Sequence, residues 1–372
     1  MPDDLPPALE WASLTAELRP LYDGALLALG RLNGLHLRIE GAQSLLRALW
    51  VREAKLSSKV ENIDTTASDM VFAAAQRDLP ERSRGKEAWN YVLALEFGVE
   101  SPLPLCTRLI KEIHAKLLTG VRGGDTRPGE FRDVPVYIGD PLRGPREARY
   151  VPPPPGEKLD RCIQAFESFV HRNDQRIPPL IAIAIAHYQF EAIHPFRDGN
   201  GRVGRVLASR SLVKEQLLDR PTVYFSEFIH KHRQRYADLL LGVSVHGNWK
   251  AWVEFMLQAI MTQAQDSIVR TEHLLHLRQS YYGALHQARA NPRLMRLVDR
   301  LFTTPVVNAQ EAQLILDVEK PTVYADLRLC ERLRILTEYT GKKRFRDWVA
   351  RDILHAIEAS TEDLRSVFDE DP

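Results

Sequence analysis

The feature that most constrains this chain is a polar, glycine-rich stretch that connects two apolar helical patterns. It runs from residue 193 to residue 205 and reads IHPFRDGNGRVGR. An apolar run over 180–186 precedes it and a helical pattern over 206–218 follows it, so we expect a loop that opens directly onto a helix N-terminus. A surface loop often has turn formers and scattered charge. Here a histidine, a carboxylate, glycines and arginines fall together, which favours a functional site.

Several residues of this stretch suit the binding of a phosphate chain. Gly199 and Gly201 let the backbone turn its N–H groups inward, and inward N–H groups at the start of a helix form an anion-binding site. Arg202 and Arg205 are three positions apart, so they share a face of that helix and offer two guanidinium groups. Asp198 supplies a hard oxygen ligand of the kind that Mg²⁺ prefers.

Two other residues of the stretch have different uses. His194 can accept a proton near neutral pH, which predicts a general base. Phe196 is apolar within a polar loop, so we expect it to anchor the loop in the core.

With these residues the stretch resembles the motif of the Fic family, H-x-F-x-D/E-G-N-G-R-x-x-R, at every specified position. Fic proteins are mostly helical enzymes, and most of them transfer AMP from ATP to a hydroxyl side chain of a protein. The resemblance implies that His194 is the base, that Asp198 holds Mg²⁺ and that ATP is the co-substrate. The nucleotide-binding residues that it implies in the motif are Asp198, Gly199, Asn200, Gly201, Arg202, Val203, Gly204 and Arg205.

A second short motif lies in the N-terminal part of the chain. On its own, the segment from Ser57 to Asn62 is equally a helix surface with a capping signal. It also resembles the S/T-x-x-x-E-G/N motif of an inhibitory helix that some Fic proteins carry, here expected over about 55–66. In those proteins the glutamate, here Glu61, pairs with the second arginine of the catalytic motif, here Arg205. A carboxylate in that position would repel the γ-phosphate of ATP.

Residues 129–139 are the one convincing strand region. Val134, Val136 and Ile138 alternate with other residues, and a second short strand is expected near residues 149–151. Taken alone, this is a structural hairpin. The segment resembles the hairpin flap of Fic enzymes, which pairs with the main chain of a target protein. The flap residues that we expect at the nucleotide are Val136, Tyr137, Ile138 and Gly139.

The position expected to contact adenine is occupied by Arg235 and Tyr236. Family members often have two aromatic residues there, and this chain has one. Tyr236 either stacks on the base or packs inside the protein, and the sequence does not separate the two.

Composition and charge narrow the class of protein. The chain has 372 residues, 44% of them apolar, and a formal net charge of +1, so no global charge favours nucleic acid or a membrane surface. Three distant cysteines match no metal or disulfide pattern. We find no signal peptide at the start and no apolar run of membrane-spanning length, so we expect a cytoplasmic protein without a membrane partner.

We expect a mainly α fold: a Fic-type helical domain with a small β-hairpin flap, and a C-terminal winged helix-turn-helix domain. Residues 1–20 read as an arm punctuated by prolines. After residue 290, three helical patterns and a strand–turn–strand pattern follow in the order of a winged helix, with Lys342, Lys343, Arg344 and Arg346 near the turn. The expected regions are 1–100 (N-terminal helical), 101–265 (catalytic), 266–290 (helical linker) and 291–372 (winged helix-turn-helix).

The function that we expect is AMP transfer from ATP to a serine, threonine or tyrosine of a protein, inhibited by Glu61. The target would dock at the flap, Gly129–Gly139, and the protein itself is one candidate target. Removal of AMP at the same site is an alternative, and transcription regulation through the C-terminal domain is another. A DNA or protein partner of that domain and a homodimer remain open.

Overall fold

The computed structural model describes most of the chain, namely residues 5, 7, 9–37, 42–74, 84–120, 127–139, 145–172, 176–341 and 346–369. Contacts divide the chain into two compact units. Unit 1 consists of Met1–Asn33, Leu56–Ile63 and Asn90–Ala264. Unit 2 consists of Gly34–Lys55, Asp64–Trp89 and Gln265–Pro372. No helix in the described residues is long and apolar enough to cross a bilayer.

Unit 1 is helical and is built around the glycine-rich motif. Four helices supply residues to both units: α1 (Trp11–Leu37), α2 (Ala42–Val60), α4 (Arg84–Glu100) and α11 (Trp249–Gln287). The helices that lie in unit 1 alone are α5 (Thr107–Leu118), η2 (Pro145–Glu147), α6 (Glu157–Val170), α7 (Pro179–Ile193), α8 (Asn200–Lys214), α9 (Phe225–Lys231) and α10 (Arg233–His246).

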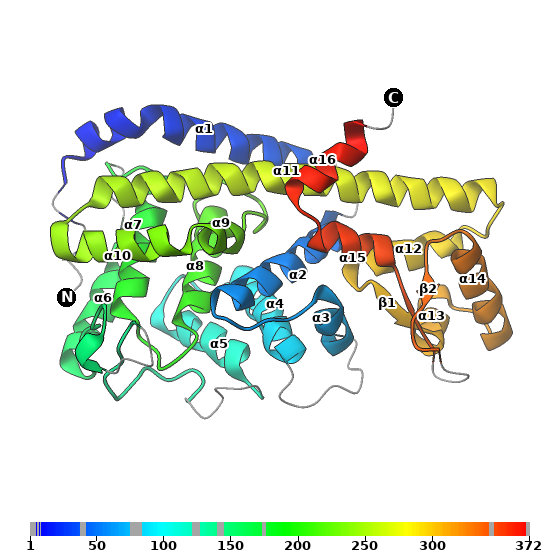
Figure 1. Ribbon diagram of the computed structural model, residues 1–372, viewed down its shortest axis with the longest axis horizontal. Helices are drawn as coiled ribbons and strands as arrows, with labels where there is room; N and C mark the ends of the chain where they lie inside the picture. The colour runs from blue at the N-terminus through cyan, green and yellow to red at the C-terminus, as the bar shows by residue number, and fades with distance from the viewer. Residues whose placement is uncertain are drawn as a thin grey trace. The chain divides into compact units, whose positions relative to one another are not determined.

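The core of unit 1 is the pair α7 and α8, which pack side by side (Figure 1). Almost every residue of α7 is buried, which explains its continuous apolar sequence. Pro179 stands at the first turn, where a missing N–H costs nothing. The Trp252 indole of α11 donates a hydrogen bond of 2.8 Å to the Ala184 carbonyl and fixes α7 from the other side. The motif between α7 and α8 is therefore held by two buried helices.

Two expectations about helices are corrected. The N-terminal arm is wrong, because α1 begins at Trp11 and contains Pro20. The stretch expected as a linker, 266–290, is mostly the second part of α11, which runs as one helix to Gln287.

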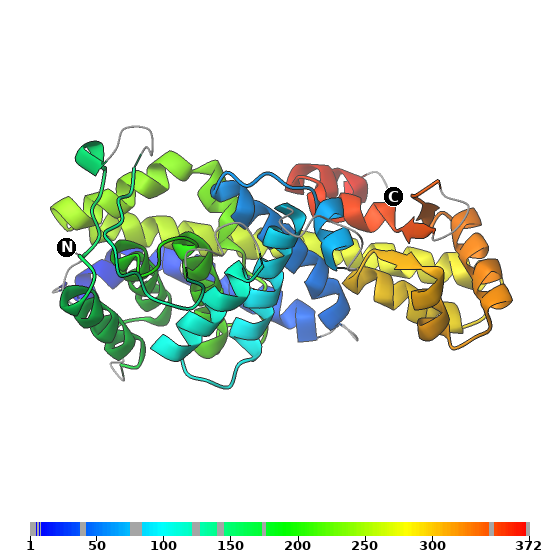
Figure 2. The ribbon, with the colours of Figure 1, turned by 90° about the horizontal axis from the view of Figure 1, so that it is seen from below.

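The flap hairpin is also corrected. The described residues 127–139 and 145–153 contain no strand, only one antiparallel bridge between Ile138 and Tyr150. Its two hydrogen bonds are each 3.0 Å, and Figure 2 draws both arms as irregular chain. Val134 is 41% exposed. A hairpin with so little to bury is marginal in water, so the alternation of apolar residues here does not produce a sheet.

Unit 2 contains the sheet of the described chain. Its elements are α3 (Ala67–Ala74), α12 (Arg293–Thr303), β1 (Val306–Asn308), α13 (Ala309–Leu316), α14 (Lys320–Arg332), β2 (Thr337–Glu338), β3 (Asp347–Val349), α15 (Arg351–Glu358) and α16 (Thr361–Asp369). The antiparallel strand order is β1-β3-β2, and Val349 pairs with both Val306 and Thr337. Lys342, Lys343 and Arg344, expected in a basic wing, lie outside the described residues.

Candidate active site

His194 lies at the C-terminal end of α7, in the left-handed conformation with φ of 49°. Its backbone N–H donates to the Phe190 carbonyl, and its Nδ1 lies 3.3 Å from the Glu191 carbonyl oxygen. Because a carbonyl can only accept, Nδ1 carries the proton and Nε2 is the acceptor. Burial lowers the pKa of His194 to about 4. The imidazole is therefore neutral at pH 7, with Nε2 able to take a proton.

The loop after His194 is fixed by its own side chains. Asn200 accepts a hydrogen bond from the Phe196 N–H (2.8 Å) and donates one to the Phe196 carbonyl (2.9 Å). Phe196 is fully buried and stacks on His114 of α5, with ring centroids 3.7 Å apart. The Asn200 side chain is thus occupied by the loop, and only its backbone N–H faces the helix start.

The first turn of α8 forms an anion-binding site. Gly199 precedes the helix with φ of 77°, a conformation that favours glycine. The Arg202 side chain is only 2% exposed and its Nη2 lies 3.8 Å from Asp198 Oδ1. Asp198 is 49% exposed, so its carboxylate faces outward beside the helix terminus. Val203 and Gly204 are buried in the same helix.

Arg205 is bound by the segment that carries the second motif. Its Nε donates to Ser57 Oγ (3.0 Å), and its Nη2 donates to the Ser57 carbonyl (3.1 Å) and to Glu61 Oε1 (2.9 Å). Burial by itself would raise the pKa of Glu61, but the charge of Arg205 outweighs it and the pKa is lowered. Glu61 is therefore ionised at neutral pH and forms a charge-assisted pair.

Glu61 stands at the end of α2 rather than within a helix that continues to about residue 66. The helix stops at Val60, and Asn62 has φ of 60°. The Asn62 N–H donates to the Lys59 carbonyl, and the Ile63 N–H donates to the Ser58 carbonyl. These two bonds define a Schellman motif, whose left-handed position accepts Gly or Asn. The turn directs the Glu61 side chain away from the axis of α2.

Gly201 makes room for the Glu61 carboxylate. A Cβ atom at Gly201 would lie 2.5 Å from Glu61 Oε1 and 3.1 Å from Arg205 Nη1. The carboxylate thus rests against the first turn of α8, where the backbone N–H groups favour an anion. Glu61 occupies the kind of position that a phosphate group would take.

Glu191 of α7 is a site residue that the sequence reasoning missed. It is only 8% exposed, and its Oε1 has no hydrogen-bond partner in the described structure. A Cβ atom at Gly204 would lie 2.4 Å from that oxygen, so the motif glycine accommodates this carboxyl group. Burial raises the pKa of Glu191 to about 7. The signal was a carboxylate inside an otherwise apolar run.

Arg132 connects the flap to the catalytic loop. It is 3% exposed, and its guanidinium donates to the carbonyls of His194 (Nε, 2.8 Å), Ile193 (Nη2, 3.3 Å), Val134 (Nη1, 3.4 Å) and Pro153 (Nη2). Its backbone N–H donates to the Pro195 carbonyl. A planar fork can serve several carbonyls at once, which a lysine cannot.

His114 makes a second connection, and no sequence pattern pointed to it. The Gly129 N–H donates to its Nδ1 (2.8 Å), so the proton lies on Nε2, which donates to the Asp198 carbonyl (3.0 Å). Burial lowers its pKa to about 4. A neutral histidine on the apolar face of α5 thus links the flap to the anion site.

The remaining expected residues border a small apolar cavity. Ile138 lines it, while Val136 lies half-buried beside that residue in the flap and Tyr137 and Gly139 are exposed. The cavity has a volume of about 70 Å³ and lies between the flap, α7 and α10. Tyr236 is half-buried, and its hydroxyl lies 3.0 Å from His187 Nε2. Its ring packs near Trp252, with centroids 5.6 Å apart.

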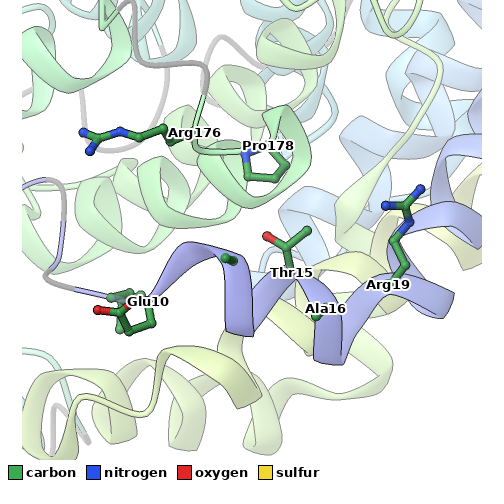
Figure 3. Close-up of a pocket in the computed structure, with 8 residues that line it drawn as sticks. Glu10, Thr15, Ala16, Arg19, Arg176 and Pro178 are labelled. Carbon is green, nitrogen blue, oxygen red and sulfur yellow. The ribbon is translucent and has the colours of Figure 1, made fainter.

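A more open hollow of about 850 Å³ lies elsewhere in unit 1, between α1 and the segment before α7 (Figure 3). Arg19 and Arg176 border it, but Arg19 is paired with Asp23 at 2.7 Å. None of the motif residues lines this hollow, so it is not the candidate site.

The donor set fits a magnesium ion that is shared with a substrate. The described residues hold no cluster of three histidine, cysteine or acidic side chains that could bind a metal by themselves. Asp198 presents one exposed carboxylate beside an anion-binding helix terminus. Mg²⁺ typically takes one or two carboxylates and completes its shell with phosphates and water.

These features define a helical protein with a Fic-type site. Residues 104–212 match the model described as Fic/DOC family, and residues 20–100 match the model described as Fic/DOC family N-terminal. The chain therefore carries a Fic domain preceded by the N-terminal region of that family.

Among solved structures, the chain resembles a Fic family protein from Desulfovibrio desulfuricans G20, with a TM-score of 0.56 and 19% identity over 89% of this chain and 96% of that one. It also resembles a Fic domain containing signaling protein from Bacteroides thetaiotaomicron VPI-5482, with a TM-score of 0.52 and 16% identity over 67% of this chain and 97% of that one. At these identities the likeness establishes the fold alone.

Among curated proteins, two relatives are named protein adenylyltransferase Fic. The Aedes aegypti protein is 34% identical over 148 residues, which are 40% of this chain and 26% of the relative. The Drosophila grimshawi protein is 34% identical over 175 residues, 44% of this chain and 34% of the relative. The chain thus spans about a quarter to a third of the length of these relatives.

Proposed function

We propose that this protein is an adenylyltransferase that moves AMP from ATP to a serine, threonine or tyrosine hydroxyl of a protein, and that Glu61 inhibits it. The observation that carries the proposal is the Glu61 carboxylate at the first turn of α8, bonded to Arg205 at 2.9 Å inside a complete Fic motif. The names of the two curated relatives support the same reaction.

The residues of α8 would hold the phosphates of ATP. The N–H groups at Gly199–Gly201 and the Arg202 guanidinium form the anion site. Asp198 would hold Mg²⁺, which supplies positive charge to the phosphates when bound. Arg205 is the remaining cation for the outer phosphate, and Glu61 now takes it. An ATP molecule bound beside Glu61 would meet a like charge at its γ-phosphate.

His194 is the group suited to start the transfer. Its Nε2 accepts the proton of the target hydroxyl as the hydroxyl oxygen forms a bond to the α-phosphorus. The bond from the α-phosphorus to the oxygen that bridges to the β-phosphorus breaks, and diphosphate leaves on the anion site. Arg132 holds the His194 carbonyl at 2.8 Å and so fixes the direction of the imidazole. Catalysis of this kind depends on positioning and charge stabilisation.

The flap is the surface on which a target segment would lie. Tyr137 and Val134 are 49% and 41% exposed, and outside the Ile138–Tyr150 bridge the flap backbone forms no strand pairing. An extended peptide can add itself to such a segment through main-chain hydrogen bonds, with little demand on sequence.

The test uses ATP labelled at either the α- or the γ-phosphate. The full chain, Glu61→Gly and Glu61→Gly/His194→Ala are each incubated with Mg²⁺ and labelled ATP. We expect protein-bound label from the α position only, strong in Glu61→Gly and absent in the double variant. Label from the γ position would replace the proposal with phosphate transfer, and equal label in wild type and Glu61→Gly would remove inhibition by Glu61.

Removal of AMP is the second candidate for the same site. The charge of Glu61 acts on His194, so a carboxylate lies near the base. A carboxylate there could position water for attack on an AMP-modified side chain. Release of AMP from a modified target by wild type, lost in Glu61→Gly, would favour this reaction over transfer.

For unit 2, we propose a winged helix-turn-helix. The order α12, β1, α13, α14, β2, β3 and the strand order β1-β3-β2 support it. Asp326, which weakened the basic character of α14 in the sequence, is buried and bonded to Arg293 at 2.9 and 3.1 Å. Arg328 and Arg332 are exposed. Salt-dependent binding of the chain to duplex DNA, lost in Arg328→Gln/Arg332→Gln, would support a DNA partner over a protein partner.

A further inference from the structure

We propose that Lys59, His230 and Arg233 form a docking surface for an acidic segment of the target protein, and that docking there loosens the inhibitory turn. This basic cluster lies entirely in unit 1. The inference rests on the proposed AMP transfer and names both a property of the target and the way in which the target relieves inhibition.

The basic cluster is formed by three helices. Lys59 is exposed in the last turn of α2, His230 lies in α9, and Arg233 is the exposed first residue of α10. Burial lowers the pKa of His230, and the charges of Lys59 and Arg233 lower it further, which shows that the three groups are close. No carboxylate of the described residues pairs with Lys59 or Arg233, and the one nearest to His230, Glu227, is bonded to Lys231 at 3.0 Å.

Arg233 holds the inhibitory turn through a neutral partner. Its Nη1 donates to Asn62 Oδ1 at 2.8 Å, next to Glu61. Both side chains belong to exposed residues. A hydrogen bond from a guanidinium to an amide is weaker than one to a carboxylate, so an acidic side chain that reaches this surface would take Arg233 from Asn62. The Schellman turn that directs Glu61 would then lose its one side-chain contact with α10.

The flap and the basic cluster are connected along α10. Arg149, next to the bridge residue Tyr150, forms an ion pair with Asp238 of α10. Asp238 and Arg233 are five residues apart, which is about 7.5 Å along a helix. An extended peptide advances about 3.3 Å per residue. A target that pairs with the flap would therefore reach the basic cluster with an acidic residue about three to five positions from its acceptor hydroxyl.

Binding is tested first, without any need for transfer. Fluorescein-labelled hexaglutamate is titrated with the full chain at about 50 mM and about 500 mM salt, and anisotropy is followed. We expect binding that weakens at high salt and weakens about threefold to fivefold in each of Lys59→Gln and Arg233→Gln. Lys158→Gln, an exposed lysine of α6, is the matched control and should bind as wild type does. Equal affinity of wild type and Arg233→Gln would overturn the docking surface.

Release is tested with label from α-labelled ATP. We expect hexaglutamate to raise incorporation by wild type several-fold and to leave Glu61→Gly unchanged. Asn62→Gly keeps the left-handed turn but removes the acceptor of Arg233, so its incorporation should rise without peptide while its peptide affinity stays that of wild type. Binding without stimulation, or equal stimulation by an oligothymidylate or by hexalysine, would overturn the inference. An inactive Glu61→Gly would instead reject AMP transfer itself, and the binding titration would still decide whether the surface exists.

Discussion

The carboxylate of Glu61 and the guanidinium of Arg205 lie 2.9 Å apart although 144 positions separate them in the chain. Their contact brings the end of α2 to the first turn of α8, where the Arg205 side chain is only 2% exposed. A buried cation needs a partner, and the partner chosen here also occupies an anion-binding helix terminus. The same contact therefore serves stability and, under our proposal, inhibition.

Gly201→Ala tests whether the carboxylate fills the space against α8. The new Cβ would lie 2.5 Å from Glu61 Oε1, so we expect a loss of about 1–3 kcal/mol in unfolding free energy. The loss should be much smaller when Glu61 is already alanine. Urea unfolding of wild type, both single variants and the double variant gives the coupling energy. Additive losses would show that Glu61 does not rest on this glycine.

Arg132→Lys tests the connection between the flap and His194. Lysine keeps the charge but cannot serve the carbonyls of His194, Ile193 and Val134 together. In the Glu61→Gly background we expect transfer to fall by about tenfold or more while the Kd of ATP stays the same. Arg127→Lys, an exposed flap arginine paired with Asp133, is the control. A parallel rise in the Kd would place the defect in ATP binding instead.

The buried histidines predict a loss of stability in mild acid. Burial lowers the pKa of His114 to about 4 and that of His187 to about 3, whereas an unfolded histidine titrates near 6.5. Their contribution is full above pH 6.5 and is lost as pH falls from there toward 4, up to about 3 kcal/mol for each. Unfolding free energy measured from pH 7 to 5 should fall, with a shallower slope in His114→Gln than in the exposed control His246→Gln. Equal slopes would contradict the low pKa of His114.

Glu191→Gln should act in the opposite direction. Burial raises the pKa of Glu191 to about 7, so its ionisation disfavours the fold as pH rises from about 4.5 through 7. Compared with wild type, the glutamine variant should gain up to about 3 kcal/mol between pH 5 and pH 8. The exposed control Glu272→Gln should show no such gain. If the stability difference between Glu191→Gln and wild type is the same at both pH values, the buried carboxyl is not titrating in this range.

The helices of the site could be predicted because their cause is local. The apolar run of α7 and the glycines before α8 mark the elements, and His194 and Asn200 stand at their ends. The Fic family domain confirms the family expected from this motif. The strand expected in the flap was wrong, because alternation does not provide a partner with which to pair. Strand β1 was not predicted, since three residues give no period.

Contacts between distant segments were beyond local patterns. The approach of Glu61 to Arg205 was expected only from the family resemblance, and no spacing in the sequence points to it. Glu191 and His114 are polar residues on apolar faces, where a buried structural role is the ordinary interpretation. Their roles depend on Gly204 and Gly129, which come close only after the chain has folded. Inhibition by Glu61 stays a prediction.

The hydrogen bonds from Arg205 to Ser57 have an evolutionary consequence. Two of the three bonds described above go to Ser57 and not to Glu61, so a lineage that replaces the glutamate does not leave the arginine without acceptors. Loss of restraint is then open to a single inherited substitution, with no compensating change required elsewhere. Restraint, in contrast, needs a carboxylate at one position and a left-handed turn beside it. Descendants of such a protein would lose control far more readily than they would regain it.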